Sequence, residues 1–175
     1  VTGGMENMSQ IPFYVPKARF GYKYGDGALV DGLSRDGLMD VYDQQAMGIY
    51  ADKTAEKYGI TREAQDAAAI NSYQKSAAST EKGLFGNEII AVEVATRKGN
   101  VLITEDEEYK NVSFDKIPTL RPAFSKDGTV TAANASTIND GAAALVLASS
   151  EAVKRLNLKP IARIVSFGDS EQAPA

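Results

Sequence analysis

LRPAFSKDGTVTAANASTINDGAAALVLAS, residues 120–149, is the stretch that decides the fold class. Its branched residues predict a short strand over 129–131. The run of tiny residues over 132–136 would let backbone amides and carbonyls lie close to a ligand. Asn139–Gly141 predicts a turn, and the apolar residues 142–147 predict a buried strand directly after it.

The chain beyond this stretch continues the alternation of elements. Ser150 is a candidate cap for a helix through Leu156, and residues 161–167 predict another strand. Strand, helix and strand in this order are typical of a βαβ unit, which predicts an α/β fold. One such unit cannot cover both faces of a parallel strand. We therefore expect neighbouring strands from residues beyond these 175, and residues 168–175 look like a cut end.

Helices and a hairpin are predicted before residue 120. Apolar residues at helical spacing predict one helix over 34–58 with a stop at Gly59. Thr61 is a candidate N-cap for a second helix, rich in alanine, that runs to Gly83. Branched residues on either side of a Lys-Gly-Asn turn predict a β-hairpin over 89–104.

An aromatic arm is predicted over residues 11–29, IPFYVPKARFGYKYGDGAL. Aromatic and branched residues alternate with lysine and arginine, and a Gly-Asp-Gly turn follows, which favours a hairpin or an extended arm. Three roles stay open: packing on its own domain, a contact between subunits, or a platform for nucleic acid. The acidic balance of the chain disfavours the third role.

Composition restricts the chemistry of the chain. Its 175 residues contain no cysteine and no histidine, which excludes thiolate nucleophiles, Ser-His-Asp triads and the usual zinc sites within them. The net charge of −4 argues against general nucleic-acid binding. No apolar run approaches the ~20 residues of a membrane helix. The acidic run 105–108 would suit either a hard cation or a solvated charged turn.

Several motifs together resemble one family. Residues 1–9, which contain GGMENMS, and the stretch 120–149 resemble the thiolases, and more narrowly the acetyl-CoA acetyltransferase (acetoacetyl-CoA thiolase) type. Further similar motifs follow in order: DGLMDVYDQQAMG at 36–48, TREAQDAAAINSY at 61–73, GLFGNEII at 83–90 and DEEYKNVSFDKIPTL at 106–120. The resemblance therefore covers the length of the chain.

The resemblance implies a thiolase-like α/β fold fragment: an α+β loop domain that covers coenzyme A, and part of a mixed-sheet core. It divides the chain into residues 1–9 as the end of the N-terminal half, 10–126 as the loop domain, 127–160 as the return to that half, and 161–175 as the start of the C-terminal half. The arm over 11–29 then corresponds to the family's tetramerisation loop, which favours contacts in a dimer or tetramer.

The resemblance also implies a reaction, the Claisen condensation of two acetyl-CoA to acetoacetyl-CoA and coenzyme A, or the reverse thiolysis. The family uses a nucleophilic cysteine, an activating histidine and a second cysteine as acid and base, and this chain has none of them. We therefore expect no catalytic residue in this chain and no activity from residues 1–175 alone. The expected contribution is coenzyme binding and oligomer contacts in an enzyme of fatty acid metabolism.

Coenzyme contacts transfer by position from the resemblance. They fall on Leu38, Met47, Tyr73, Asn111, Val112, Ser113, Lys116 and Ser136. Lys116 would neutralise a phosphate, Ser136 would bind a pantetheine amide, and Tyr73 would close the adenine end. The structural alternatives are a solvated lysine, a serine bonded within its own turn, and a tyrosine in helix packing.

The resemblance further implies a potassium ion bound by Tyr73 and by the carbonyls of Ala132, Ala133 and Ala135. Two positions depart from the family pattern. Ala46 stands where short-chain biosynthetic members usually carry histidine, which leaves the acyl-chain preference open. Asn111 stands where relatives often carry arginine, which would weaken a phosphate contact.

Two other functions stay open at this stage. One is a non-catalytic thiolase-like protein that binds coenzyme A or lipid, and the other is a structural interaction module that uses the arm. The expected partners are an acyl-CoA and further copies of the chain, and neither nucleic acid nor membrane. The expected location is the cytoplasm, or the mitochondrial matrix in a eukaryote.

Overall fold

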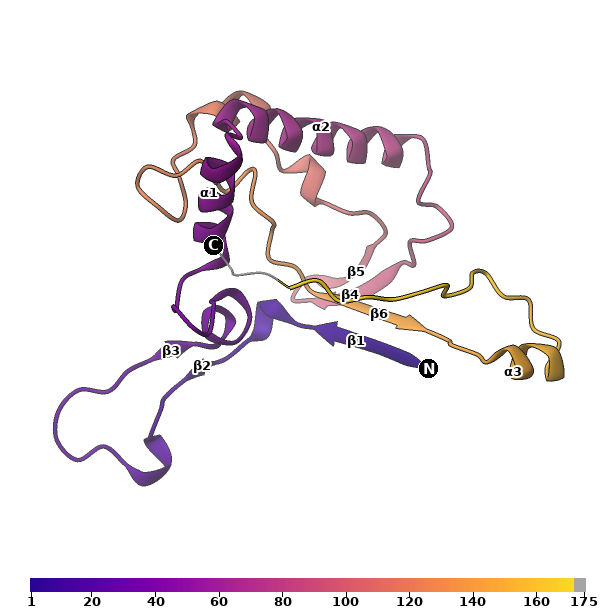
Figure 1. The fold of residues 1–175 in the computed structure, drawn as a ribbon, viewed down its shortest axis with the longest axis horizontal. Coiled ribbons are helices and arrows are strands. Elements are labelled where there is room, and N and C mark those ends of the chain that lie inside the picture. Colours follow the sequence, from indigo (N-terminus) through magenta and orange to yellow (C-terminus); the bar gives the residue numbers. More distant parts are fainter. Residues whose placement is uncertain (172–175) are drawn as a thin grey trace. The chain divides into compact units, whose positions relative to one another are not determined.

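The computed structural model describes residues 1–171, which form two compact units. The first unit contains residues 1–47 and the chain from 137 onward, and the second contains residues 48–136. Figure 1 shows the ribbon of both units. Of the segment 161–175, which we expect to begin the second thiolase half, residues 172–175 lie outside the described residues. The domain boundaries inferred from sequence stay predictions.

The first unit contains a two-stranded antiparallel sheet. Strand β1 (Thr2–Glu6) pairs with β6 (Gly141–Leu145) from Thr2 opposite Leu145 to Glu6 opposite Gly141. A Cβ on Gly3 would lie 2.5 Å from the Ala143 carbonyl oxygen, so this close pairing requires glycine. All residues of both strands are exposed, so β6 forms as predicted but is not buried.

The arm leaves the first unit as a hairpin, one of its predicted forms. Its base is the antiparallel pair of β2 (Phe13–Tyr14) and β3 (Val30–Asp31), and a 3₁₀ turn over Ala18–Phe20 lies between them. Phe20 is 88% exposed and Tyr24 is fully exposed. The tip of the arm therefore does not pack on its own unit.

The predicted helix over 34–58 is wrong in its first half. Ser34–Leu38 forms a single π-helical turn, and helix α1 begins only at Met47. The carboxylate of Asp40 explains the break, because it accepts hydrogen bonds from the backbone N–H groups of Tyr42 and Asp43, at 2.9 and 3.0 Å. This Asx turn competes with the helix for the same donors.

Two helices dominate the second unit. Helix α1 (Met47–Tyr58) ends at Gly59, whose φ is +63°, and the Ile60 N–H donates back to the Ala55 carbonyl. Helix α2 (Arg62–Glu81) begins after Thr61, whose side chain accepts from the Ala64 N–H at 3.2 Å. Thr61 is therefore the predicted N-cap, and the left-handed Gly59 is the predicted stop.

Helix α2 is followed by a hairpin and two short turns. Gly83, with φ +66°, follows the end of α2 as predicted. The predicted hairpin forms from β4 (Val92–Thr96) and β5 (Gly99–Ile103), which pair antiparallel. The 3₁₀ turns η4 (Glu108–Lys110) and η5 (Phe114–Thr119) then lead to residue 120.

The strand predicted over 129–131 does not form. The Asp52 carboxylate on α1 instead accepts the backbone N–H groups of Thr129 and Val130, at 2.8 and 2.9 Å. It also accepts the Ser125 hydroxyl at 2.7 Å. A side chain from another element therefore takes the donors that a β-ladder would use. Burial raises the pKa of Asp52, but these three hydrogen bonds outweigh it and leave the pKa below its ordinary value.

The last part of the first unit departs from the predicted βαβ pattern. Asn139–Gly141 forms no turn, because the Asp140 carboxylate accepts the Ser9 N–H at 2.9 Å and the chain runs straight into β6. Helix α3 (Ser150–Arg155) forms, but Ser149 rather than Ser150 is its cap. Residues 161–167 form no strand, since no described strand pairs with them.

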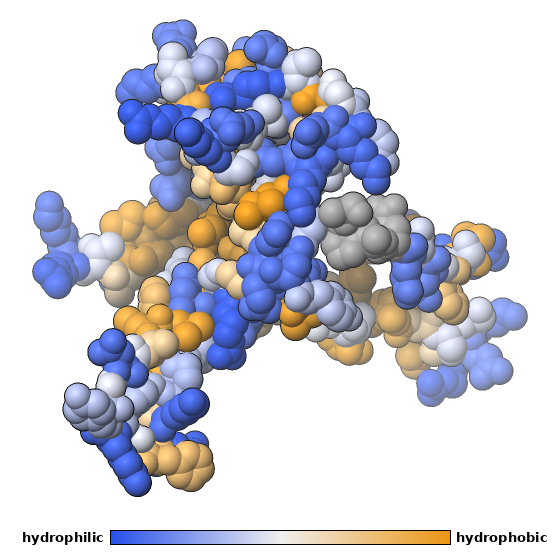
Figure 2. Space-filling view, turned by 60° about the vertical axis from the view of Figure 1, so that its left-hand side comes forward, coloured by the Kyte–Doolittle hydropathy of each residue, from blue (hydrophilic) through white to orange (hydrophobic). Residues whose placement is uncertain are grey.

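Apolar side chains reach the surface in many places. Figure 2 shows orange, hydrophobic atoms exposed across the visible face. Large exposed side chains include Val146 at 78% and Phe167 at 95%.

Within residues 1–171, none of the helices has the length and apolar character needed to cross a membrane.

We predict that replacing Asp52 by asparagine lowers the free energy of unfolding by about 1–3 kcal/mol at neutral pH, because three partly buried donors lose their charged acceptor. The folded-state pKa of Asp52 is depressed, so its contribution is complete above the unfolded value of about 4 and is lost as pH falls through the folded value. Denaturant unfolding of the protein that carries this chain, between about pH 7 and pH 2, measures this.

The Asp52→Asn variant should lose less stability on acidification than the unchanged protein. Asp127→Asn is the matched control, because Asp127 is an exposed carboxylate in the same unit. Parallel pH curves for the unchanged and Asp52→Asn proteins would contradict the assignment.

Candidate functional site

A buried ion pair lies at the start of helix α2. Arg62 and Asp66 are four residues apart, which puts their side chains on one face of the helix. The Arg62 Nε donates to the Asp66 carboxylate at 2.7 Å, and the two side chains are only 20% and 8% exposed. A buried charge pair is stable only where its remaining hydrogen-bonding atoms are also satisfied.

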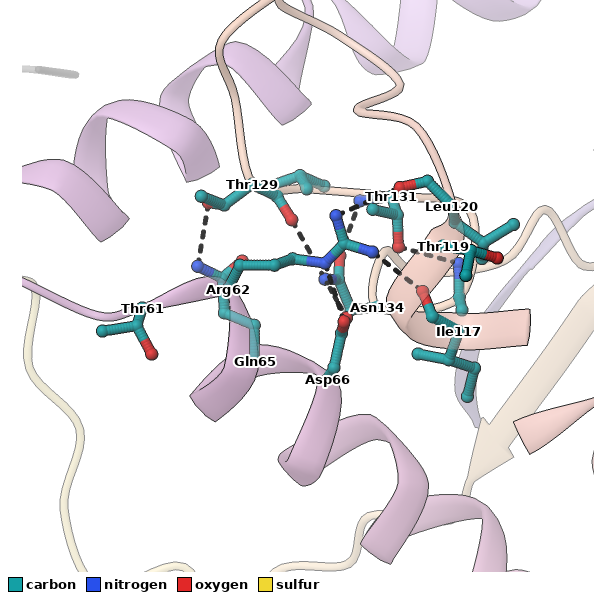
Figure 3. A network of polar contacts seen from close by, with 12 residues as sticks. Thr61, Arg62, Gln65, Asp66, Ile117, Thr119, Leu120, Thr129, Thr131 and Asn134 are labelled. Atoms are coloured by element: carbon teal, nitrogen blue, oxygen red, sulfur yellow. Dashed lines mark hydrogen bonds and ion pairs between the residues drawn. The ribbon is translucent and has the colours of Figure 1, made fainter. Parts of the chain in front are cut away.

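The guanidinium of Arg62 satisfies its other donors on the turn η5. One terminal nitrogen donates to the Ile117 carbonyl at 2.8 Å, and the other donates to the Leu120 carbonyl at 3.1 Å. Ile117 itself is 1% exposed. Arg62 therefore joins α2 to the turn that carries Lys116 (Figure 3).

The second oxygen of Asp66 accepts from the Asn134 amide nitrogen at 3.0 Å. The same amide nitrogen donates to the Thr129 carbonyl at 3.1 Å, and the Asn134 amide oxygen accepts the Thr131 N–H at 2.7 Å. Figure 3 shows Asn134 between Asp66 on the one side and Thr129 and Thr131 on the other. Through Arg62 and Asn134, Asp66 therefore connects two segments that are far apart in sequence.

A tight turn over 131–135 follows from this anchoring. The Thr131 hydroxyl accepts the Ala133 N–H at 3.3 Å, and its carbonyl accepts the Ala135 N–H at 3.0 Å. Thr131 is fully buried, at 0% exposure. Ala132 and Ala133 lie in this turn, and their methyl side chains are too small to fill the space beside them.

That space is a hollow of about 260 Å³ within the second unit. Its lining comes from α2, from η4 and η5 with the residues between and after them, and from the 131–135 turn. The lining residues are Tyr73, Glu108, Asn111, Val112, Ser113, Lys116, Ile117, Leu120, Ala132 and Ala133. Backbone, hydroxyl, aromatic and ammonium groups therefore face one concave surface.

Five of the eight predicted coenzyme contacts line this hollow. They are Tyr73, Asn111, Val112, Ser113 and Lys116. Ser136, which is exposed, and Ala135 belong to the same unit but are not among the lining residues. Leu38 and Met47 belong to the first unit. The structure therefore brings together the predicted contacts of the second unit except Ser136.

The polar groups of the lining differ in charge. Burial raises the pKa of the Tyr73 hydroxyl, and the negative charge of Glu108 raises it further by a smaller amount. That hydroxyl is therefore protonated at neutral pH and can donate a hydrogen bond. Lys116 is exposed and brings a positive charge to the opening. An ammonium group of this kind binds phosphate as a point charge.

Glu108, Ile117 and Leu120 also line the hollow, and sequence reasoning did not select them. Nor did it find the Arg62–Asp66–Asn134 network. The four-residue spacing of Arg62 and Asp66 is a detectable signal for the ion pair, whereas nothing local marks Asn134 as its third member. Within residues 1–171 no group of three or more histidine, cysteine and carboxylate side chains is arranged so that it could hold a metal ion. In the acidic run 105–108, Glu105 binds Tyr109 and Lys110.

Comparison with known proteins identifies the family. The model of the thiolase N-terminal domain matches residues 1–151. The chain belongs to the thiolase family. This confirms both the family and the α/β thiolase-like fold class that the motifs predicted.

Three relatives illustrate the thiolase match. A cytosolic acetyl-CoA acetyltransferase of Gibberella zeae is 51% identical over 99% of this chain and 44% of its own length. A mitochondrial acetyl-CoA acetyltransferase of Bos taurus is 51% identical over 99% of this chain and 41% of its own. The crystal structure of the Acat5 thiolase of Ascaris suum in complex with coenzyme A is 52% identical, with a TM-score of 0.82 over 94% of this chain and 41% of that one. The chain thus spans less than half the length of these relatives.

We predict strong coupling between Arg62 and Asp66. In a double-mutant cycle of Arg62→Ala and Asp66→Ala, each single variant leaves a largely buried charge without its opposite charge, so the coupling energy should reach about 1–3 kcal/mol. Denaturant unfolding of the protein that carries this chain measures it.

The exposed pair Arg35–Asp36 is the matched control, with side chains 51% and 47% exposed. Its cycle should give a coupling energy below about 1 kcal/mol. Equal coupling energies in the two cycles would show that burial does not strengthen the interaction between Arg62 and Asp66.

Proposed function

We propose that this chain forms the coenzyme-binding part of an acetyl-CoA C-acetyltransferase. The reaction would join two acetyl-CoA molecules into acetoacetyl-CoA and coenzyme A, or reverse this by thiolysis. The observation that carries the proposal is the convergence of Tyr73, Asn111, Ser113 and Lys116 on one hollow. Two relatives of about 50% identity that carry the same enzyme name add support.

Each lining group has a role in this proposal. The Lys116 ammonium neutralises a phosphate of coenzyme A, while Asn111 and Ser113 offer hydrogen-bonding side chains beside it. Tyr73 presents its ring to the adenine end and its hydroxyl as a donor. The bare backbone of Ala132 and Ala133 admits close approach of the coenzyme.

The remaining predicted contacts complete the proposal outside the hollow. Ser136 would bind a pantetheine amide, and Leu38 and Met47 would supply an apolar wall along the pantetheine. The acyl transfer itself needs a thiolate, and this chain has no cysteine. Cysteine and histidine from residues beyond this chain would therefore act on the thioester that these residues bind.

A potassium ion is the cofactor that the family resemblance implies. Tyr73, Ala132 and Ala133 border the same hollow, and neutral carbonyl oxygens suit a monovalent cation. The Ala135 carbonyl would be the remaining ligand in this chain. The ion would stiffen the turn over 131–135, and it takes no part in bond making.

Oligomer contacts belong to the proposal as well. The exposed aromatic tip of the arm, with Phe20 and Tyr24, suits a contact in a dimer or tetramer. Cytosolic and mitochondrial forms both occur among the relatives, and we propose a location in the cytoplasm, or in the mitochondrial matrix of a eukaryote.

We predict that Lys116→Ala in the protein that carries this chain raises the KM for acetoacetyl-CoA about three- to tenfold with little change in kcat, because one phosphate contact is lost. The increase should shrink as ionic strength rises, since salt screens exposed charges. Steady-state thiolysis kinetics measure both effects. Lys82→Ala, which removes an exposed lysine of the same unit that does not line the hollow, should leave KM unchanged. A KM unaltered by Lys116→Ala would refute the proposed site.

We predict that residues 1–175 alone show no thiolase activity, because they supply no cysteine or histidine. The protein that carries them should cleave acetoacetyl-CoA in the presence of coenzyme A. Release of acetyl-CoA, followed with both samples, tests this. Turnover by the isolated chain would disprove the division of roles, and inactivity of the larger protein on every acyl-CoA would favour a non-catalytic coenzyme- or lipid-binding protein.

A further inference from the structure

Asp66 lies outside the lining of the hollow, yet Arg62 and Asn134 connect it to both segments that carry most of that lining. We propose that Asp66 is a positioning residue that sets the two coenzyme-facing segments relative to each other. One of its oxygens acts through Arg62 on η5, and the other acts through Asn134 on the 131–135 turn. This inference rests on the proposed function.

The first branch runs from Asp66 to Lys116. Arg62 bonds the carbonyls of Ile117 and Leu120, at 2.8 and 3.1 Å, while its Nε binds the carboxylate at 2.7 Å. Because the guanidinium is planar, these three bonds fix the turn η5 in orientation as well as in distance. Lys116 precedes the anchored Ile117 directly, so the position of its backbone follows from Arg62.

The second branch runs from Asp66 to Ala132 and Ala133. The Asn134 amide uses its nitrogen on Asp66 and on the Thr129 carbonyl, and its oxygen on the Thr131 N–H. The amide therefore spans the turn from inside and holds the two alanines at the edge of the hollow.

A carboxylate is the side chain that this position needs. Asp66 is 5% exposed and faces one donor with each oxygen, from Arg62 and from Asn134. An asparagine there would offer a single oxygen, and its NH₂ would face one of the two donors. Asp66→Asn should therefore break the hydrogen bond to either Arg62 or Asn134 while it keeps the volume of the side chain.

Thiolysis kinetics of the complete protein test the inference with two substrates, acetoacetyl-CoA and S-acetoacetyl-pantetheine, which lacks the nucleotide. For Asp66→Asn and Asn134→Ala we expect the KM for acetoacetyl-CoA to rise about tenfold with kcat within about twofold. With the pantetheine thioester the KM should rise clearly less, because this substrate lacks the phosphate and adenine groups that Lys116 and Tyr73 would contact. Because KM does not depend on the folded fraction, partial misfolding of a variant would not produce this pattern.

Glu63→Gln is the control, since it also converts a carboxylate into an amide. Glu63 is exposed and lies three residues before Asp66 on the same helix. This variant should leave both KM values unchanged. If Lys116→Ala raises the KM for acetoacetyl-CoA while Asp66→Asn and Asn134→Ala do not, the positioning role is refuted and the proposed function stands. If none of the three variants changes this KM, the proposed function fails as well. An equal rise for both substrates would reduce Asp66 to a general structural role.

Discussion

The buried charge of Asp66 is the constraint on which the second unit depends. A carboxylate that is 8% exposed loses most of its hydration, and it regains that energy from Arg62 and Asn134. Arg62 and Asn134 in turn form hydrogen bonds with backbone groups in segments that contain no long helix or strand. The cost of burying one charge therefore forces α2, η5 and the 131–135 turn into a single arrangement.

Side chains that anchor the turns also define the walls of the hollow. The hollow is lined mainly by short turns, which have few ladder hydrogen bonds of their own. Polar side chains of the two helices supply the missing partners, through Asp52 on α1 and through Arg62 and Asp66 on α2. Turns held in this way keep their backbone accessible, as a coenzyme-binding surface requires, while their positions stay defined.

The two units differ in how they are stabilised. The second contains fully buried side chains, Ile117 and Thr131, at the centre of its polar network. The sheet of the first unit, β1 with β6, is exposed on all its residues, and so is the tip of the arm. Exposed strands and aromatic side chains of this kind suit contacts with further strands or with another subunit.

Local signals in the sequence determined the elements whose partners are near in the chain. Thr61 caps α2, Gly59 and Gly83 follow the helix ends, and the hairpin of β4 and β5 closes on itself, because each needs only its neighbours. Ordered motifs were also enough to establish the family and to select seven residues of the hollow. Tertiary structure decided the rest. Distant carboxylates took the backbone donors of Thr129, Val130 and Ser9, and residues 161–167 met no partner strand among the described residues. A backbone N–H donates to whichever acceptor folding brings to it. The residues next to it in sequence do not reveal which acceptor that will be.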